Sequence, residues 1–261
     1  NGYASIALTS REPRMRNIYA AEDAFFGAQP LFARSKDTLF DFTQPLVNPE
    51  RMMDIEIGGR YKSANGNYAV GVNGFLMEFT NELVKSGRLD IFGNPVDGNA
   101  PRSRHYGIEV DGNALLTDMK DAGKIILSGN ISFSQNRFVE YDYYLSSTEK
   151  ISLNDNPIAG FPDLLANLRL SYHAGGLNAS VLFKYVGAFY SDNFGVKLNG
   201  YRANFPGITS YADNKADAYS IVNIDLAYEF ARVFSLETLR LHAHCTNVLN
   251  ALYAANAEGK E

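Results

Sequence analysis

His242 and His244 are the residues of this sequence whose type and spacing first suggest chemistry. Residues two apart on a β-strand point to the same face, so these imidazoles could share a metal ion. Zinc sites use three or four protein ligands, and the sequence offers no third ligand nearby. We therefore interpret the two histidines as lining a wet surface, and we predict no metal or other cofactor. Cys245 points to the opposite face, where a thiol behaves as a small apolar group.

Two polar clusters lie in segments without regular periodicity. The Asp and Asn side chains between residues 90 and 99 carry oxygen ligands suited to calcium. Their spacing is not that of an EF-hand loop, and an ordinary turn-rich loop explains them better. Arg11, Arg14 and Arg16 form a basic run that could capture an anionic ligand. A solvated loop is the plainer interpretation of that run.

A third cluster consists of Tyr141, Tyr143 and Tyr144, again outside the periodic segments. Loops on a rigid scaffold often carry binding residues, so these rings could contact a ligand, although loop packing alone would also explain them. No G-x-S-x-G elbow, phosphate-binding Gly-Lys-Ser/Thr loop or H-E-x-x-H pair occurs. None of these catalytic motifs therefore supports an enzyme.

Composition excludes several classes of protein. The 261 residues are 46% hydrophobic and 13% aromatic, which excludes a disordered chain, and the single Cys excludes a disulfide framework. A net charge of -5 argues against a nucleic-acid partner. No run approaches 18 apolar residues and no signal peptide opens the sequence, so we expect neither a transmembrane helix nor a leader in this numbering. A transmembrane β-barrel remains open, because alternation dilutes its apolar residues.

The dominant pattern has a period of two, which is typical of β-strands. In residues 163–173 apolar and polar side chains alternate, with Leu168 on one face and Arg169 on the other. Residues 177–185 repeat the pattern after a glycine turn, so the two segments predict a long hairpin. Three further hairpins are predicted at 52–61 with 68–79, 104–116 with 124–134, and 222–230 with 239–244. A weaker ninth strand covers residues 3–9.

The apolar phase of the second strand in the 52–79 hairpin changes along its length. Val70 and Val72 fall on one phase, whereas Phe75, Met77 and Phe79 fall on the other. Such a change predicts a β-bulge near Gly71 or Gly74.

Connections between the strands alternate between short and long. Short ones lie near residues 64–67, 118–123, 174–176 and 231–236, and long ones cover about 11–50, 81–103, 139–162 and 191–216. Outer-membrane barrels show this alternation, with short periplasmic turns and long extracellular loops. The strands are also long enough, since roughly 9–11 tilted residues cross a bilayer.

Charge decides which face of the strands meets lipid. A lysine or arginine on the lipid side at the bilayer midplane costs about 2–4 kcal/mol. The charged face must therefore line the lumen, and so many charges imply a wide, wet barrel. Its residues include Glu56, Arg60, Glu109, Lys124, Arg169, Lys184, Asp225, Glu229 and Arg240. Of these, Arg169, Lys184 and Arg240 join His242 and His244 as candidate ligand contacts in the lumen.

Several motifs occur in the order found in one known family. Asn247-Val248-Leu249-Asn250 followed by Tyr253 is similar to a closing N-L-F-N-x-x-Y motif. Ahead of it stand Tyr219 with Val222-Asn223, Lys184-Tyr185-Val186-Gly187, Tyr190-Ser191-Asp192-Asn193, Gly107-Ile108-Glu109, Phe75-Leu76-Met77-Glu78-Phe79, Glu56-Ile57-Gly58 and Arg11-Glu12-Pro13. The chain resembles the C-terminal part of the β-barrel of TonB-dependent outer-membrane receptors over essentially its whole length.

The resemblance implies that residues 1–261 are a portion of a larger barrel. Family barrels are up-and-down, antiparallel and about 22-stranded, whereas nine strands are predicted here. The N-terminal plug, the TonB box, the early strands and the last strand of the family have no counterpart in this sequence.

The same resemblance implies a function without a chemical step, in the outer membrane of a Gram-negative bacterium. Such a receptor takes up a scarce solute, for example a ferric siderophore, cobalamin or a glycan. Its partners would be that ligand, the outer-membrane lipid and lipopolysaccharide, and the TonB complex acting through the plug region. Two alternatives stay open: a passive porin-type channel, and a soluble all-β carbohydrate-binding or hydrolytic domain whose apolar faces pack together as a sandwich.

Overall fold

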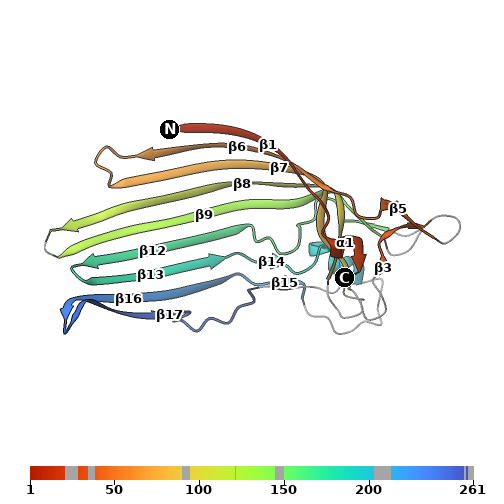
Figure 1. The fold of residues 1–261 in the computed structure, drawn as a ribbon. Helices are drawn as coiled ribbons and strands as arrows, with labels where there is room; N and C mark the ends of the chain where they lie inside the picture. The colour runs from red at the N-terminus through yellow and green to blue at the C-terminus, as the bar shows by residue number, and fades with distance from the viewer. Residues whose placement is uncertain are drawn as a thin grey trace.

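The computed structural model describes residues 1–20, 29–34, 39–89, 95–120, 122–144, 150–202, 213–255 and 257. Nine of its strands form one antiparallel sheet in which each strand pairs with the next long strand along the chain (Figure 1). In sheet order they are β1 (Gly2–Arg11), β6 (Glu50–Lys62), β7 (Tyr68–Leu89), β8 (Pro95–Met119), β9 (Gly123–Glu140), β12 (Leu164–Ala174), β13 (Leu177–Val186), β16 (Tyr219–Val233) and β17 (Leu236–Cys245). The predicted nine-stranded meander is confirmed.

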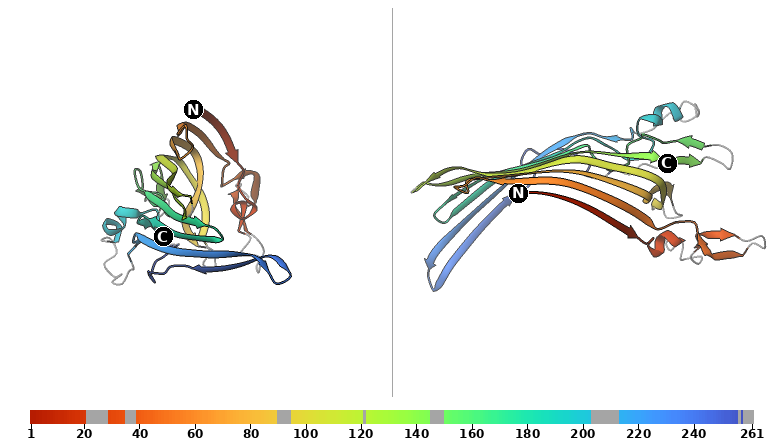
Figure 2. Two further views of the ribbon diagram at one scale, coloured as in Figure 1. Left: turned by 90° about the vertical axis from the view of Figure 1, so that its left-hand side faces the viewer. Right: turned by 90° about the horizontal axis from the view of Figure 1, so that it is seen from above.

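The sheet is open and curved. β1 and β17 are its two edges, and Figure 2 shows the strands between them bending into a trough that is one part of a barrel wall. Tight turns join the strands at one end, where Gly66 (φ 74°) and Gly175 (φ 53°) adopt the left-handed conformation that glycine tolerates. No helix among the described residues is long and apolar enough to cross a membrane.

The two faces of the sheet differ as the alternation predicts. Residues directly opposite each other share a face, and Leu170, Val181 and Ile224 follow one another across three strands of the apolar face. Their exposed fractions are 45%, 42% and 41%, and no second layer covers them. Burial of these side chains against a second sheet would have indicated a soluble sandwich, and that arrangement is absent from the described residues.

The bulge predicted near Gly71 or Gly74 is wrong. β6 and β7 pair without a register shift from Arg51 opposite Thr80 to Lys62 opposite Ala69. Phe75, Met77 and Phe79 therefore lie on the polar face. The next strand pair, β8 with β9, does contain register shifts. They lie between Arg102 and Ser103 and between Leu115 and Thr117.

The long connections are more ordered than their sequence suggests. Much of the predicted 81–103 loop is strand, because β7 and β8 continue past the rim of the sheet as a paired extension. The other connections carry small elements gathered at the same end (Figure 1). They are α1 (Met15–Ile18), β2 (Tyr19–Ala20), β3 (Gln29–Pro30), β4 (Phe32–Arg34), β5 (Phe40–Pro45), β10 (Asp142–Tyr144), β11 (Lys150–Ser152), β14 (Phe189–Tyr190), η2 (Gly195–Lys197), α2 (Leu198–Arg202) and β15 (Lys215–Ala216).

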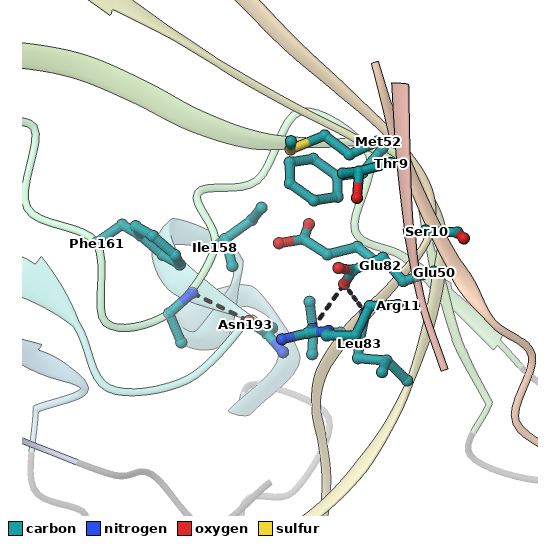
Figure 3. A pocket seen from close by; sticks show the side chains of 13 residues that line it. Thr9, Ser10, Arg11, Glu50, Met52, Glu82, Leu83, Ile158, Phe161 and Asn193 are labelled. Atoms are coloured by element: carbon teal, nitrogen blue, oxygen red, sulfur yellow. Dashed lines mark hydrogen bonds and ion pairs between the residues drawn. The ribbon is translucent and has the colours of Figure 1, made fainter. Parts of the chain in front are cut away.

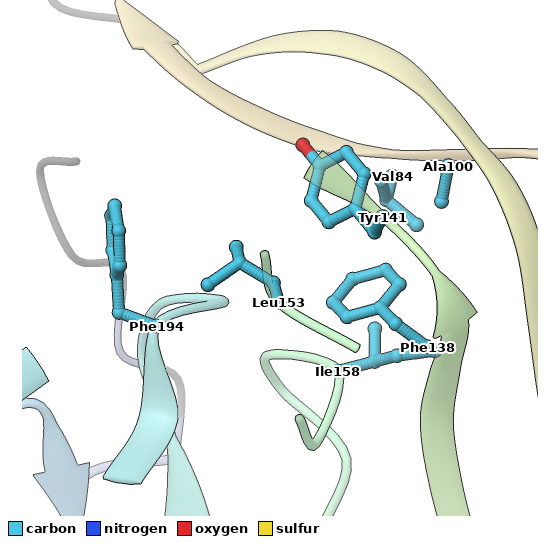
Figure 4. Close-up of a cluster of buried hydrophobic side chains, with 7 residues drawn as sticks. All are labelled: Val84, Ala100, Phe138, Tyr141, Leu153, Ile158 and Phe194. Carbon is cyan, nitrogen blue, oxygen red and sulfur yellow. The ribbon is translucent and has the colours of Figure 1, made fainter. Parts of the chain in front are cut away.

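The hydrophobic core lies among these connections and not within the sheet. Seven buried side chains from the ends of β7, β8 and β9 and from two connections form one cluster (Figure 4). They are Val84, Ala100, Phe138, Tyr141, Leu153, Ile158 and Phe194. This core fixes the connections against the strand ends, and so builds a rigid rim over the polar face.

Candidate functional site

A cavity of about 590 Å³ opens on the polar face just below this rim (Figure 3). Strands β1, β6 and β7 form one wall, and the connections around residues 158–161 and 193 form the other. Its lining residues are Thr9, Ser10, Arg11, Glu50, Met52, Phe79, Glu82, Leu83, Val84, Ile158, Ala159, Phe161 and Asn193. The cavity thus combines apolar side chains with a few converging polar groups, as ligand sites commonly do.

Arg11 and Glu50 form an ion pair at the cavity wall. They lie opposite each other on β1 and β6, and the Arg11 Nη2 donates to Glu50 Oε2 at 2.8 Å. The same carboxylate oxygen accepts the backbone N–H of Leu83 at 2.8 Å, so Glu50 also holds β7 in place. About half of the Arg11 side chain is exposed, whereas Glu50 is nearly covered. Arg11 is therefore the member of the pair that a ligand can reach.

Glu82 and His105 form a second, buried pair behind the first. His105 Nε2 lies 3.2 Å from both Glu82 carboxylate oxygens, and its Nδ1 lies 2.7 Å from Asn136 Oδ1. The Ser103 hydroxyl donates a further hydrogen bond to Glu82. Both ring nitrogens face acceptor oxygens, so a doubly protonated imidazolium could donate a hydrogen bond from each of them.

Aromatic rings cover this pair on two sides. The His105 ring packs edge-on against Phe79 at 5.0 Å and against Phe161 at 5.3 Å between centroids. Phe79 belongs to the apolar run on the polar face of β7, and Phe161 comes from the connection before β12. These rings reduce the access of water, which strengthens the charge interaction between His105 and Glu82.

An irregular residue aims Glu82 into the lumen. Asn81 has a φ of 56°, which interrupts the strict alternation of β7. The Asn99 side chain fixes this position, since its Nδ2 donates to Asn81 O at 2.8 Å and to Asn48 O at 3.0 Å. Glu82 consequently faces Ser103 and His105 on the polar face, whereas strict alternation after Glu78 and Thr80 would place it on the apolar face.

Side-chain amides hold the opposite wall of the cavity. The buried Asn156 donates to the backbone oxygens of Asn193 and Phe194 at 3.0 and 2.6 Å, and Asn193 Oδ1 accepts the N–H of Ala159. Asp192 Oδ1 accepts hydrogen bonds from Asn214 and from the Gly195 N–H. Burial raises the pKa of the Asp192 carboxyl above its usual range despite these two donors.

A second group of polar residues lies lower on the polar face, near the other edge of the sheet. His244 Nδ1 lies 2.6 Å from Asp225 Oδ1, and His242 Nε2 lies 3.5 Å from the same oxygen. Arg169 adds positive charge to their surroundings. All three side chains of the Asp225 group are substantially exposed. Among the described residues, no three His, Cys, Asp or Glu side chains are placed to hold a metal ion.

The residues predicted as ligand contacts fall into separate places. Among the candidates whose side chains the structure describes, Arg11 alone lines the rim cavity. The candidates of the polar face follow the predicted alternation: Arg169, Lys184, Arg240, His242 and His244.

The basic and tyrosine runs contribute mainly to the connections. The Arg14 N–H donates to Asn17 Oδ1 at the start of α1, while the side chain of Arg16 lies outside the described residues. Tyr141 is buried in the core, and Tyr143 packs against Phe194 at 5.1 Å between centroids. The Tyr144 side chain and part of the 90–99 segment, including Asp90 and Asn94, also lie outside the described residues.

The sequence reasoning missed Glu50, Glu82 and His105 as members of one cluster. The apolar residues Phe75, Met77 and Phe79 predict a bulge in β7. The strand has no bulge there, so its polar face continues up to the rim and carries these three side chains. The alternation of His105 with Glu109 and Asp111 does place His105 on the polar face of its strand, but it gives His105 no partner. Nothing in the local sequence pairs it with Glu82, since that contact depends on the unusual backbone of Asn81.

The closing motif has a clear structural role. Asn247 adopts a φ of 49°, and its side chain bonds both the N–H and the oxygen of Ala251 at 2.9 Å. Its own N–H donates to Asn223 Oδ1 at 2.9 Å, and the Tyr253 ring stacks on Tyr219 at 4.5 Å. The motif therefore folds the chain after β17 back onto the end of β16.

A family model for the β-barrel of TonB-dependent receptor-like proteins matches residues 1–248. The chain belongs to the TonB-dependent receptor family. The resemblance in its motifs is thus confirmed, and its antiparallel sheet is part of a receptor barrel. Members of this family are outer-membrane proteins of Gram-negative bacteria.

Solved receptors share the fold at low sequence identity. The siderophore receptor PiuA from Acinetobacter baumannii superposes with a TM-score of 0.62 at 16% identity, over 98% of this chain and 30% of its own. The FrpB iron transporter from Neisseria meningitidis superposes with a TM-score of 0.60 at 16% sequence identity, and the match covers 97% of this chain and 33% of the transporter. The copper transporter OprC superposes with a TM-score of 0.61 at 15% sequence identity, and the match covers 97% of this chain and 32% of OprC. No curated protein matches this sequence. The chain spans about a third of the length of these solved receptors.

Proposed function

We propose that residues 1–261 form the C-terminal portion of the β-barrel of an outer-membrane receptor that imports a scarce solute with energy supplied by the TonB complex. The observation that carries this proposal is the rim cavity on the polar face of a sheet that belongs to this receptor family. The apolar face would contact lipid, and the polar face would line the lumen. The function involves binding and release, with no chemical step.

The rim cavity is the proposed place of ligand contact. Its position below the connections suits a solute that enters from outside the cell and is held before release. Arg11 offers an exposed guanidinium, and Phe79, Phe161 and Met52 offer apolar contacts to a ligand scaffold. The other candidate contacts along the path are Tyr143, Tyr144, Arg14, Arg16 and the lower lumen residues Arg169, Lys184, Arg240, His242 and His244. Tyr141 is buried in the core, and a ligand would reach it only if that core opened.

The names of the structural relatives support a metal complex as the cargo. PiuA is a siderophore receptor and FrpB an iron transporter. We therefore favour a ferric siderophore over cobalamin or a glycan. The TonB complex would act through the plug region of the receptor.

Uptake measurements in a Gram-negative host test this proposal. The complete receptor that contains this segment should restore growth on an iron–siderophore source, and the restoration should disappear when TonB is deleted. Substitution Phe161→Ala should weaken ligand binding to the purified receptor, because it removes one wall of the cavity. Uptake that persists without TonB would instead support a passive porin-type channel.

The facing of the sheet has its own test. Leu168 and Arg169 are neighbours on opposite faces of β12. Leu168→Arg should impair membrane assembly strongly, because a charge on the lipid side near the midplane costs about 2–4 kcal/mol. Arg169→Leu should assemble almost normally. Heat-modifiable migration of outer-membrane fractions on gels measures assembly, and equal effects of the two substitutions would contradict the assignment of faces.

A further inference from the structure

Four arginines gather on the outer face of the sheet, immediately below the rim and on the side opposite the cavity. They come from three of four consecutive strands of the sheet: Arg51 from β6, Arg102 and Arg104 from β8, and Arg137 from β9, with β7 between β6 and β8. Their phase is that of the apolar face, since Arg51 precedes Met53 and Arg104 precedes Tyr106 at intervals of two residues. We call these four residues the outer arginine patch.

The register of the sheet brings the patch together. Thr80 on β7 lies opposite both Arg51 and Arg102, and Arg104 lies opposite both Glu78 and Arg137. Directly opposed residues have Cβ atoms about 4.5–5.5 Å apart. Arg104 and Arg137 are therefore direct neighbours, whereas Arg51 and Arg102 lie two strands apart with Thr80 between them. The patch spans four strands of the outer face at nearly the same height.

Acidic neighbours neutralise only part of the positive charge. Arg104 Nε is paired with Glu78, and Arg137 Nη1 donates to the Asp155 backbone oxygen at 2.8 Å. Glu140 lies opposite Arg102 across the bulge. Arg51 and Arg102 are exposed, and neither makes an ion pair among the described residues. Four arginines against Glu78 and Glu140 leave a net charge of about +2 in an area that faces away from the lumen.

A depression lies beside the patch on the same face. It has a volume of about 480 Å³, and its lining includes Arg51, Thr80 and Glu78 together with Leu8 and Met53. Its polar end is at the rim and its apolar end is toward the belt of exposed aliphatic side chains. An amphipathic molecule with an anionic head and a hydrocarbon tail matches this polarity.

A boundary between water and hydrocarbon at this height is also visible in the side chains. Tyr106 and Gln135 come next below the patch, with the Tyr106 hydroxyl donating to Gln135 Oε1 at 2.5 Å. Ile108 and Phe133 follow, and both are exposed. A tyrosine between charged and apolar residues is typical of the membrane interface.

We propose that the outer arginine patch binds the phosphate groups of an outer-leaflet lipid, with the acyl chains lying along the apolar face below. This assignment rests on the proposed function only in placing the sheet in the outer membrane. Guanidinium groups suit the role because their planar donors pair with phosphate oxygens in bidentate fashion. The patch would fix the height of the barrel in the membrane and leave the lumen free for the imported solute.

Lipid binding to the complete purified receptor tests the patch. The probes are phosphorylated lipid A, lipid A from which the phosphates have been removed, and inorganic phosphate. The double variant Arg51→Gln/Arg102→Gln should bind phosphorylated lipid A roughly ten- to thirtyfold more weakly, since each basic residue near an anionic surface contributes about 1 kcal/mol. Removing the phosphates should have a similar effect on the unmodified receptor. Arg60→Gln, a charge loss near the turn end of the polar face, should leave lipid binding unchanged.

Three results would overturn the assignment. They are equal affinity for the two lipids, unchanged affinity in the double variant, and inorganic phosphate bound as tightly as the lipid. The variant Arg51→Lys/Arg102→Lys keeps the charge but not the bidentate geometry, so it should lose less affinity than the Gln variant, which separates loss of charge from misfolding. Loss of TonB-dependent uptake with intact lipid binding would contradict the proposed transport function and leave the patch assignment standing.

Discussion

The polar face of this sheet carries two sites where histidine contacts a carboxylate, and the two sites differ in their surroundings. At the rim, His105 and Glu82 are buried between Phe79 and Phe161, and Asn136 and Ser103 complete their hydrogen bonds. Lower down, Asp225 contacts His242 and His244 in an open position. The comparison shows that a histidine and a carboxylate stabilise the fold where they are buried away from water. Where they are exposed, the same residue types line the solvent-filled side of the sheet.

The largest expected effect is at the buried pair. His105→Leu should lower the free energy of unfolding by about 3–5 kcal/mol, because Glu82 would be left as a buried charge without its partner. Urea unfolding of the complete receptor in detergent measures this change. His244→Leu is the matched control in the open pair, and it should cost about 0–1 kcal/mol. Similar costs for the two substitutions would remove the distinction between the pairs.

Removing both members of the buried pair should be less damaging than removing one. In Glu82→Leu/His105→Leu no unpaired charge remains, and apolar replacements of buried ion pairs are often nearly neutral. We expect the double variant to recover more than half of the stability lost in His105→Leu. Urea unfolding of both single variants and the double variant gives the coupling free energy. Additive losses would show that Glu82 and His105 act independently.

The sequence predicted the sheet better than the rim, and the reason is physical. Alternation such as that of Leu168 and Arg169 is imposed directly by the two environments on either side of a strand, so it is readable one strand at a time. The turn at Gly175 and the closing Asn247 are equally local, because each depends on its own backbone conformation. The faces of the strands, this turn and the closing motif are therefore predictable from the sequence alone.

The rim cavity depends on contacts between distant residues and was not predictable in the same way. Glu82 meets His105 only because Asn81 interrupts the alternation of β7, and Asn81 is held by Asn99 from the next strand. The tyrosine at 141 was a candidate for ligand contact, but its burial depends on the fold of the whole connection. Of the predicted basic run, Arg11 reached the cavity because it is still part of β1 and opposes Glu50.

Two carboxylates in the connections outside the nine-stranded sheet also differ in burial, and their pKa values shift in opposite directions. Burial raises the pKa of Asp192, whereas hydrogen bonds from Thr43 lower the pKa of the exposed Asp41. A raised carboxyl pKa in the folded state means that the fold binds protons more readily than the unfolded chain. The stability of the 192–195 connection should therefore fall as the pH rises from the ordinary Asp value, 3.8, through the raised one.

Hydrogen exchange at the Gly195 amide, corrected for intrinsic rates, measures this dependence. Its protection factor should decrease over that pH window in the unmodified receptor. In Asp192→Asn the decrease should disappear, since the amide keeps an acceptor for Gly195 but does not ionise. Protection that increases with pH would mean that the hydrogen bonds to the ionised carboxylate outweigh its burial.

The smallest expected effect is at the open pair itself. Asp225→Asn removes the charge that faces His242 and His244, but solvent screens these exposed contacts, so they add little to stability. We expect the urea midpoint of the complete receptor to change little, while the Asn side chain keeps an oxygen acceptor for His244. A loss comparable to that of His105→Leu would mean that the lower pair is shielded from water in the assembled barrel. In that case the two histidine sites would differ because of what covers them in the complete barrel, and not because one lies at the rim and the other lower on the sheet.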